Sequence, residues 1–428
     1  MGLLTSAVVR SLLLTSAYAF SDLSHPMFNR QALAASDDTV LPPSKDPFYT
    51  APSGFETAAP GTILRMRDAP GNLTDVVMNS TAAYNILYRT TDSQYKPSWA
   101  VTTLFVPETS ATSGAHDRLL SYQIPYDSAY LDASPSYTLY AGPPTDIALA
   151  LGQGWFVSVP DYEGPLASFT AGVQSGHATL DSIRAVLSKS STFGLVNETR
   201  YAMWGYSGGA LASEWAAELQ VQYAPEMTFA GAALGGLTPN TTNVLDTVTG
   251  TLEAGLIPAG ILGVASQFPE AYAYLLSQLK TSGPYNRTKF LMAQNQTLSE
   301  TIVAFAGEDI TEYFIGGEAA LAAPITQMII NRDGIMGYHG VPQMPIFAYK
   351  AIADEISPVA DTDELVKRYC AVGADIWYQR NTVGGHSAEA TNGDSRAFEW
   401  LTAVFDGIYD RKGCTVEDVT VAITTSPI

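Results

Sequence analysis

A serine flanked by glycines, placed between an apolar strand and a helix, constrains this chain more than any other feature. The motif Gly205-Tyr206-Ser207-Gly208-Gly209 follows an apolar run at 201–204 and precedes an alanine-rich helical run. In such a strand–turn–helix unit the turn is so tight that the serine hydroxyl projects from the edge of a sheet. Side chains at Gly205 and Gly209 would collide with neighbouring backbone there. The following helix would direct its first N–H groups, Gly208 foremost, at a developing oxyanion.

Strands and helices alternate along most of the chain, a pattern typical of an α/β fold with a mainly parallel sheet covered on both faces. A polar turn between the first two strands predicts an antiparallel hairpin at one edge. Strands are expected at 84–89, 99–106, 119–124, 154–160, 201–206, 229–234, 344–348 and 375–379, and helices at 177–189, 208–223, 361–372 and 395–409.

The alternation stops between residues 237 and 340. That region holds helix-like segments at 252–266 and 314–330 and no convincing strand. A helical block inserted between strands of one sheet is typical of a cap, with a larger core of longer helices as the alternative. We therefore expect a signal peptide at 1–19, a first core part with an N-terminal arm at 20–236, a helical cap at 237–340, and a second core part at 341–428.

Several features indicate a secreted, extracellular protein. Arg10 precedes an apolar run at 11–18, and Ala17-Tyr18-Ala19 has the form cleaved by signal peptidase. The apolar run is too short for a transmembrane segment. Six Asn-x-Ser/Thr sequons predict glycosylation. They begin at Asn72, Asn79, Asn197, Asn240, Asn286 and Asn295.

Two cysteines, Cys370 and Cys414, are the only ones in the chain. In an oxidising compartment they are expected to form a disulfide, with two buried free thiols as the alternative. The chain has neither a Cys-x-x-Cys nor a His-Glu-x-x-His motif, and its 5 histidines lie far apart. We therefore expect no metal site and no cofactor.

The charge balance limits the partners. The chain has 42 acidic and 22 basic residues, a formal net charge of −20. Phosphate-rich partners would be repelled, so we expect no nucleic-acid binding, and anionic membranes are disfavoured. A neutral ester or lipid substrate remains compatible with this charge.

A nucleophilic serine needs a base, and histidine is the usual one. Where the serine motif stands between strand and helix, the acid and then the histidine follow it in the chain. His339 follows Ser207 but leaves little room for an intervening acid after a strand. His386, in Val-Gly-Gly-His-Ser after the strand at 375–379, is the predicted base. The remaining histidines precede Ser207 and have the wrong order: His25, His116 and His177.

The acid is expected just beyond the carboxyl end of the strand at 344–348, where such sheets place functional residues. Asp354 is the best candidate and Glu355 its rival. Asp361 and Asp363 are better explained as favourable charges at a helix N-terminus. Residue types and spacing leave the choice between Asp354 and Glu355 open.

Matching stretches running nearly from end to end make the chain similar to a known family, the fungal secretory lipases of the lipase A type. The resemblance is carried by Asp46-Pro47-Phe48-Tyr49, Pro60-Gly61-Thr62-Ile63-Leu64-Arg65, Ser121-Tyr122-Gln123 with Asp127-Ser128, Val159-Pro160-Asp161-Tyr162-Glu163-Gly164, Ser175-Gly176-His177-Ala178-Thr179-Leu180-Asp181-Ser182, the Gly205–Gly209 motif, and the Asp354 and His386 regions.

The resemblance implies an α/β-hydrolase fold with a helical cap and a Ser207–His386–Asp354 catalytic triad. It also implies an oxyanion site at Gly208 and Asp127, and triacylglycerol hydrolysis. Separately, the helical cap and its apolar run at 252–264 favour a substrate met at a lipid–water interface, with plain cap core as the alternative explanation of that run. An ionised Asp127 would repel the oxyanion, so we expect its carboxyl to be protonated. Unlike many relatives, the chain has no cysteine shortly after Asp127-Ser128 and none in the cap. We therefore expect a more mobile cap and carry no substrate preference over.

The sequence thus predicts a secreted serine lipase acting through an acyl-enzyme. Carboxylesterase or acyltransferase activity on short-chain or non-lipid esters is one alternative, and a serine peptidase on the same fold is another. A catalytically silent, hydrolase-like binding protein is the alternative from another class. The sequence does not determine the oligomeric state.

Overall fold

The structure is a computed structural model that describes residues 39–108, 117–196 and 198–423. The chain divides into two compact units, Met1–Thr39 and Val40–Ile428. Nearly all described residues belong to the second unit. The expected signal peptide at 1–19, the histidines at 25 and 116, and the sequon at 197 lie outside the described residues.

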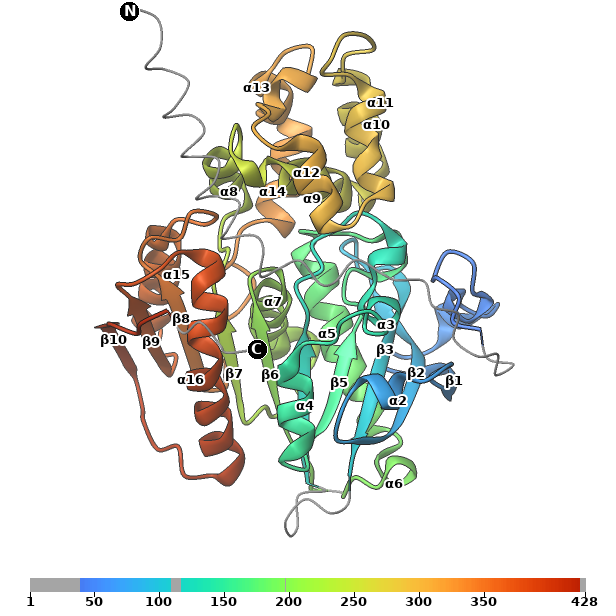
Figure 1. The fold of residues 1–428 in the computed structure, drawn as a ribbon, viewed down its shortest axis with the longest axis vertical. Helices are drawn as coiled ribbons and strands as arrows, with labels where there is room; N and C mark the ends of the chain where they lie inside the picture. Colours follow the sequence, from blue (N-terminus) through green and yellow to red (C-terminus); the bar gives the residue numbers. More distant parts are fainter. Residues whose placement is uncertain (1–38, 109–116, 197, 424–428) are drawn as a thin grey trace, which may run out of the picture. The chain divides into compact units, whose positions relative to one another are not determined.

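A 10-stranded sheet runs through the second unit in the order β1-β2-β3-β5-β4-β6-β7-β8-β9-β10 (Figure 1). Pairing is antiparallel from β1 to β5 and parallel from β5 to β10. This confirms the mainly parallel sheet with an antiparallel edge. The strands are β1 Ile63–Asp68, β2 Ser80–Thr91, β3 Pro97–Pro107, β4 Arg118–Gln123, β5 Phe156–Pro160, β6 Arg200–Tyr206, β7 Gly231–Gly235, β8 Ile346–Ala351, β9 Ile376–Asn381 and β10 Cys414–Val419.

Helices cover both faces of the sheet because successive side chains of a buried strand point to opposite sides. In β6, Met203 joins the apolar cluster under α5, α7 and α15. Its neighbour Trp204 joins the cluster under α4 and α16 on the other face. These helices are α4 Thr145–Gly152, α5 Gly172–Leu187, α7 Gly208–Tyr223, α15 Val359–Ala371 and α16 His386–Asp406.

Residues 237–340, here called the cap segment, form short helices grouped at one end of the sheet (Figure 1). They share an apolar cluster that includes Phe290, Phe305 and Tyr313, and that cluster extends to Phe169 and Ile356 outside the segment. The helices are α8 Thr241–Val248, α9 Leu256–Ser266, α10 Pro269–Gln278, α11 Arg287–Phe290, α12 Leu298–Phe305, α13 Glu318–Leu321 and α14 Pro324–Asp333. The boundaries of the cap as a separate domain stay a prediction.

Several elements differ from the sequence-based expectation. The last long helix begins at His386, nine residues before the expected start at 395, so the histidine stands in a helical first turn and not in a loop. The helix expected at 314–330 is two helices, because the second starts at Pro324, a residue suited to a first helical position. Strands β1 and β10 were not expected.

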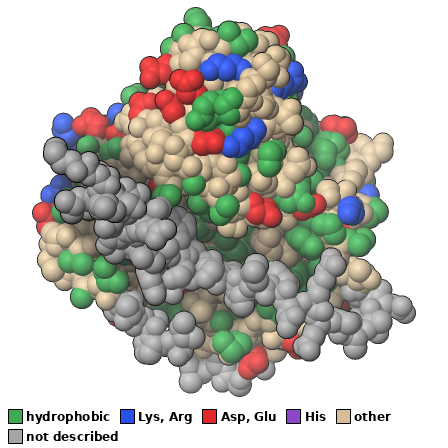
Figure 2. Space-filling model, turned by 45° about the horizontal axis from the view of Figure 1, so that its top comes forward, with side chains coloured by type: hydrophobic (Ala, Val, Ile, Leu, Met, Phe, Trp, Pro, Cys, Tyr) green, Lys and Arg blue, Asp and Glu red, His purple; other side chains and the backbone are tan. Residues whose placement is uncertain are grey.

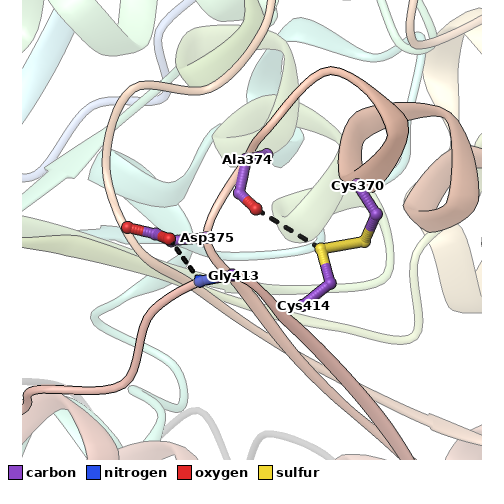
Figure 3. Close-up of a disulfide and its surroundings, with 5 residues drawn as sticks. All are labelled: Cys370, Ala374, Asp375, Gly413 and Cys414. Carbon is purple, nitrogen blue, oxygen red and sulfur yellow. Dashed lines mark hydrogen bonds between the residues drawn. A yellow bond between two sulfur atoms is a disulfide. The ribbon is translucent and has the colours of Figure 1, made fainter.

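A disulfide joins Cys370 of α15 to Cys414 of β10 (Figure 3). Beside it, the Asp375 carboxylate accepts the N–H of Gly413 at 2.6 Å. The carbonyl oxygen of Ala374 lies 3.3 Å from the sulfur of Cys414. The last strand is therefore covalently attached to a helix that packs on the sheet.

The described surface leaves the sequon asparagines accessible. Asn79 and Asn295 are exposed, and Asn72, Asn240 and Asn286 are partly exposed. Glycosylation stays a prediction. On the face that Figure 2 shows, hydrophobic side chains stand in separate groups among acidic and basic ones. None of the helices in the described part of the chain combines the length and hydropathy that crossing a bilayer requires.

Candidate active site

Ser207 lies in a strained turn between β6 and α7. Its backbone has φ 53° and ψ −121°, a conformation that is costly for a residue other than glycine. The surrounding glycines make the turn possible. A Cβ at Gly205 would lie 2.2 Å from the carbonyl oxygen of Gly209, and one at Gly209 would lie 1.9 Å from that of Gln123. The N–H of Ser207 donates to Gly235 of β7 at 2.9 Å, which fixes the turn against the neighbouring strand.

His386 and Ser207 meet although 179 positions separate them in the chain. The Nε2 atom of His386 lies 2.8 Å from Oγ of Ser207. Its Nδ1 lies 2.8 Å from Oδ2 of Asp354. The side chain of His386 is 10% exposed, so it is largely shielded from water while Ser207 remains half-buried. This chain of contacts can move a proton from the serine hydroxyl to the imidazole.

The carboxylate of Asp354 is held from all sides. Oδ1 accepts the N–H groups of Ile356 at 2.9 Å and Ser357 at 2.8 Å. Oδ2 accepts Nζ of Lys350 at 2.8 Å as well as the imidazole. Burial alone would raise the pKa of Asp354, but the hydrogen bond and charge of His386 and the ammonium of Lys350 hold it well below its usual range. The group is therefore ionised at all ordinary pH values.

The side chain of Glu355, the rival acid, contacts the backbone of His386 and not its imidazole ring. Its Oε2 accepts the N–H of His386 at 2.8 Å. No side-chain cap comes from Gly385 at the start of α16, so Glu355 satisfies one of the free N–H groups of that first turn. The hydroxyl of Tyr206 donates to the carbonyl oxygen of His386 at 2.5 Å. Both contacts fix the orientation of the residue that carries the imidazole.

Asp127, in the loop after β4, lies directly against the serine turn. Its φ is 42°, and it is 5% exposed. A Cβ on Gly208 would come within 1.8 Å of its Oδ1, so a larger residue at position 208 would displace the Asp127 carboxyl. Among the described residues, Oδ1 has no hydrogen-bond partner. Burial raises the pKa of Asp127 to about 7, although the charge of His386 opposes the shift. Below that pH the carboxyl is neutral and can donate a hydrogen bond.

An apolar cavity of about 240 Å³ opens above these groups. Its floor includes Ser207, Gly208 and Asp127, and most of its walls come from the cap segment. No lysine, arginine or histidine is among its lining residues. The wall residues contributed by α8 and α9 include Val244, Leu245, Leu256, Ile257, Ile261 and Val264. A neutral, apolar ester fits this environment better than an anionic one.

Two histidines in the described part of the chain lie away from this site. His177 is fully buried and stacks on Tyr223 at 3.9 Å between ring centroids, and burial lowers its pKa to about 3. His339 lies 3.3 Å from Glu218. Within the described residues no group of three or more histidine, cysteine, aspartate or glutamate side chains could hold a metal ion.

The sequence did not lead us to expect two contacts at the site. One is the ion pair between Lys350 and Asp354, and the other is the hydrogen bond from the backbone N–H of His386 to Glu355. Lys350 had a detectable signal, because a lysine inside an otherwise apolar strand, four residues before an aspartate, is rarely buried without a partner. The hydrogen bond from His386 N–H to Glu355 had no signal in the sequence, because it depends on where α16 begins.

Comparison with known proteins gives a consistent result. The family model described as "Secretory lipase" matches residues 143–413. The chain is 54% identical to Trichothecene C-3 esterase of Fusarium sporotrichioides over 91% of this chain and 90% of that protein. It is 36% identical to Lipase A of Arthroderma benhamiae, over 90% and 85% of the two chains. The crystal structure of Candida antarctica lipase A in its closed state matches with a TM-score of 0.81 and 29% identity, covering 91% of this chain and 92% of that one.

The family match covers residues 143–413, which include the serine turn, and the structural match covers 91% of the chain. The α/β-hydrolase fold and the resemblance to fungal lipase A proteins are thereby confirmed. The chain belongs to the secretory lipase family and is a carboxylic ester hydrolase.

Proposed function

We propose that the protein is an extracellular serine esterase in which Ser207 is the nucleophile, His386 the general base and Asp354 the orienting acid. The observation that carries the proposal is the pair of 2.8 Å contacts from His386, to Ser207 Oγ and to Asp354 Oδ2. An ionised, fully hydrogen-bonded aspartate holds the imidazole in the tautomer whose Nε2 is free to accept a proton.

The reaction proceeds in two acyl-transfer steps. Ser207 Oγ attacks the ester carbonyl while His386 Nε2 takes its proton, and a tetrahedral oxyanion forms. When it collapses, the C–O bond to the alcohol breaks and His386 returns the proton to the departing alkoxide. The acyl group is left on Ser207. Water then attacks this acyl-enzyme with His386 again as base, and the carboxylic acid is released.

The oxyanion is assigned to the N–H groups of Gly208 and Asp127, with the neutral carboxyl of Asp127 as a further donor. Gly208 is the first residue of α7, where N–H groups lack partners within the helix. Each such donor contributes about 3 kcal/mol to transition-state stabilisation in comparable sites. The pKa of Asp127, raised to about 7 by burial, supports a protonated side chain in mildly acidic solution.

For the substrate, we favour a trichothecene ester, the class named in Trichothecene C-3 esterase. The 54% identity to that protein and the apolar cavity above Ser207 support this choice. Triacylglycerol hydrolysis is the second candidate, supported by the similarity to Lipase A of Arthroderma benhamiae.

The nucleophile is tested by labelling with a fluorophosphonate and mapping the modified residue. We expect a single adduct on Ser207 and none in Ser207→Ala, which should also lose at least about a thousandfold of ester-hydrolase activity. Ser213→Ala, on the same helix, is the matched control and should label normally. Labelling elsewhere, or near-normal turnover by Ser207→Ala, would refute the assignment.

The substrate is tested by comparing kcat/KM on a C-3 acetylated trichothecene, a soluble short-chain alkyl ester and an emulsified long-chain triacylglycerol. We expect kcat/KM to be highest on the trichothecene, lower on the short-chain ester and lowest on the triacylglycerol. A rate on the emulsion that exceeds both others, and rises once droplets form, would establish the triacylglycerol candidate instead.

A further inference from the structure

Lys350 is a buried lysine next to the proposed catalytic acid. It lies in β8, and neither its side chain nor that of Asp354 is exposed (0% for both). Nζ donates to Oδ2 of Asp354 at 2.8 Å and to the carbonyl oxygen of Leu237 at 2.8 Å. A charge this deep is costly unless it is paired. The proposed mechanism gives Lys350 no role.

The same oxygen atom, Oδ2 of Asp354, therefore accepts two cationic or potentially cationic donors, Lys350 and the imidazole of His386. Without the lysine, the resting site would hold one buried negative charge. With it, the charges of Asp354 and Lys350 cancel, and a neutral imidazole adds no further charge to that pair. A protonated imidazole would place a second positive charge close to the ammonium, and like charges at such range repel strongly in a buried site.

We propose that Lys350 is a positioning residue for ester hydrolysis, whose buried ammonium shares Oδ2 of Asp354 with His386, balances the charge of that carboxylate, and favours the unprotonated imidazole that can accept the Ser207 proton. This inference rests on the proposed function. It implies that the enzyme remains active in more acidic solution than the histidine–aspartate pair alone would allow.

Other charged groups also face the two cations, so the effect of Lys350 must be separated from theirs. They lie on the loop after β8, on α15, on β6 and on the loop after β4. These titratable groups are Asp354 and Glu355 on the loop after β8, Asp361 on α15, Tyr206 on β6, and Asp127 on the loop after β4. All of these groups are acids, so among them and Lys350 the positive charge next to Oδ2 of Asp354 comes from Lys350. Burial lowers the pKa of Lys350, and Asp354 opposes that shift.

The test is the pH profile of kcat/KM on a neutral soluble ester from about pH 4 to about pH 9. In Lys350→Met, which keeps length without charge, the acidic limb should move about one unit toward higher pH. The loss should therefore be about tenfold near pH 5 and small near pH 8. Lys350→Arg should restore the limb. Lys367→Met, an exposed lysine on α15 with 78% side-chain exposure, removes the same charge and should not move it.

A purely structural lysine would lower kcat/KM equally at every pH, and an unmoved limb in Lys350→Met overturns the inference. If that variant does not fold, melting temperatures decide. Asp354→Asn leaves the ammonium without its partner, so Lys350→Met added to Asp354→Asn should raise the melting temperature above that of Asp354→Asn alone. A further decrease would overturn the inference.

Fluorophosphonate labelling of the wild type separates this result from failure of the proposed function. Labelling on Ser207 with an unmoved acidic limb overturns the role of Lys350 alone. Absence of labelling on Ser207 overturns the proposed mechanism, and the role of Lys350 with it.

Discussion

The sheet and the cap segment contribute to the same cavity but are held in different ways. The residues that react follow β6, β8 and β9, strands that lie inside the sheet with a paired neighbour on each side. The cap segment has its own apolar cluster and also meets the sheet through polar contacts, such as Asp333 with Ser93 Oγ at 2.6 Å. The sheet thus fixes the chemistry, while the cap supplies most of the wall that meets the substrate. Substitutions in the two regions should therefore have different kinetic signatures.

The largest effect is expected within the loop after β8. Asp354→Asn should lower kcat/KM by about a thousandfold to ten-thousandfold on every ester, because the amide no longer stabilises the imidazolium or the productive tautomer. Glu355→Gln should cost no more than about tenfold, since an amide oxygen can still accept the N–H of His386. Steady-state kinetics on two unrelated esters would measure this. Comparable losses in the two variants would contradict the assignment of the acid.

A cap substitution should change which ester is hydrolysed rather than how fast the chemistry occurs. Leu245 of α8 lines the cavity, and Leu245→Trp should reduce kcat/KM on a bulky polycyclic ester by about tenfold or more, through lost space. A small acetate ester should be little affected. Val303→Trp, on α12 with the side chain 80% exposed, is the control and should change neither rate. Equal losses on both esters would place Leu245 in the chemical step.

The pH dependence of Asp127 tests the sheet side of the cavity. Its pKa is raised to about 7, so the donating carboxyl is present below that pH and is lost as pH rises through it. Asp127→Asn always has an N–H donor and should retain several-fold more of its pH 6 activity at pH 9 than wild type does. Asp161→Asn is the control, because burial also raises the pKa of Asp161 to about 7 and it does not line the cavity above Ser207. Complete loss of activity in a folded Asp127→Asn would count against a donor role.

The smallest effect concerns the contact between cap and sheet. Burial raises the pKa of Asp333 to about 7. Its protonated form therefore favours folding fully below about pH 4, and this contribution is lost as pH rises to about 7. Asp354, whose pKa is depressed, contributes in the opposite sense and loses its contribution below about pH 4. We expect a higher melting temperature at pH 5 than at pH 8, and in Asp333→Asn that difference should shrink by about 2 °C or more. Glu399→Gln, an exposed site on α16, should leave it unchanged.

The sequence allowed the central sheet and the serine turn to be predicted because their signals are local. Short apolar runs predict buried strands. The glycines around Ser207 are needed because the backbone there passes close to residues a few positions away or to the adjacent strand. The order of serine, acid and histidine then selected His386. Asp354 was the best acid from its place after the strand at 344–348, and the family resemblance separated it from Glu355. Asp127 came from the resemblance alone, and the roles of both residues stay predictions.

The features that were missed depend on distant parts of the chain. Strand β10 is largely exposed and lacks the apolar alternation of a core strand. Helix α5 begins at Gly172, earlier than its apolar periodicity suggests, because Gly172 packs against Trp215 of α7. The start of α16 at His386 has no local capping residue, and its acceptor comes from Glu355 on another loop. Such contacts exist only after the sheet has assembled.

The crosslink between α15 and β10 reaches further than the edge of the sheet. Just beyond β10, the backbone of Val421 bonds to the side chain of Asn381, and Thr382 donates to the carbonyl of Val419. Those residues begin the short loop that leads into His386. Reduction would remove the covalent link to α15 and leave β10 held by its pairing with β9, so we expect the loop before His386 to lose part of its support while the turn at Ser207 is untouched.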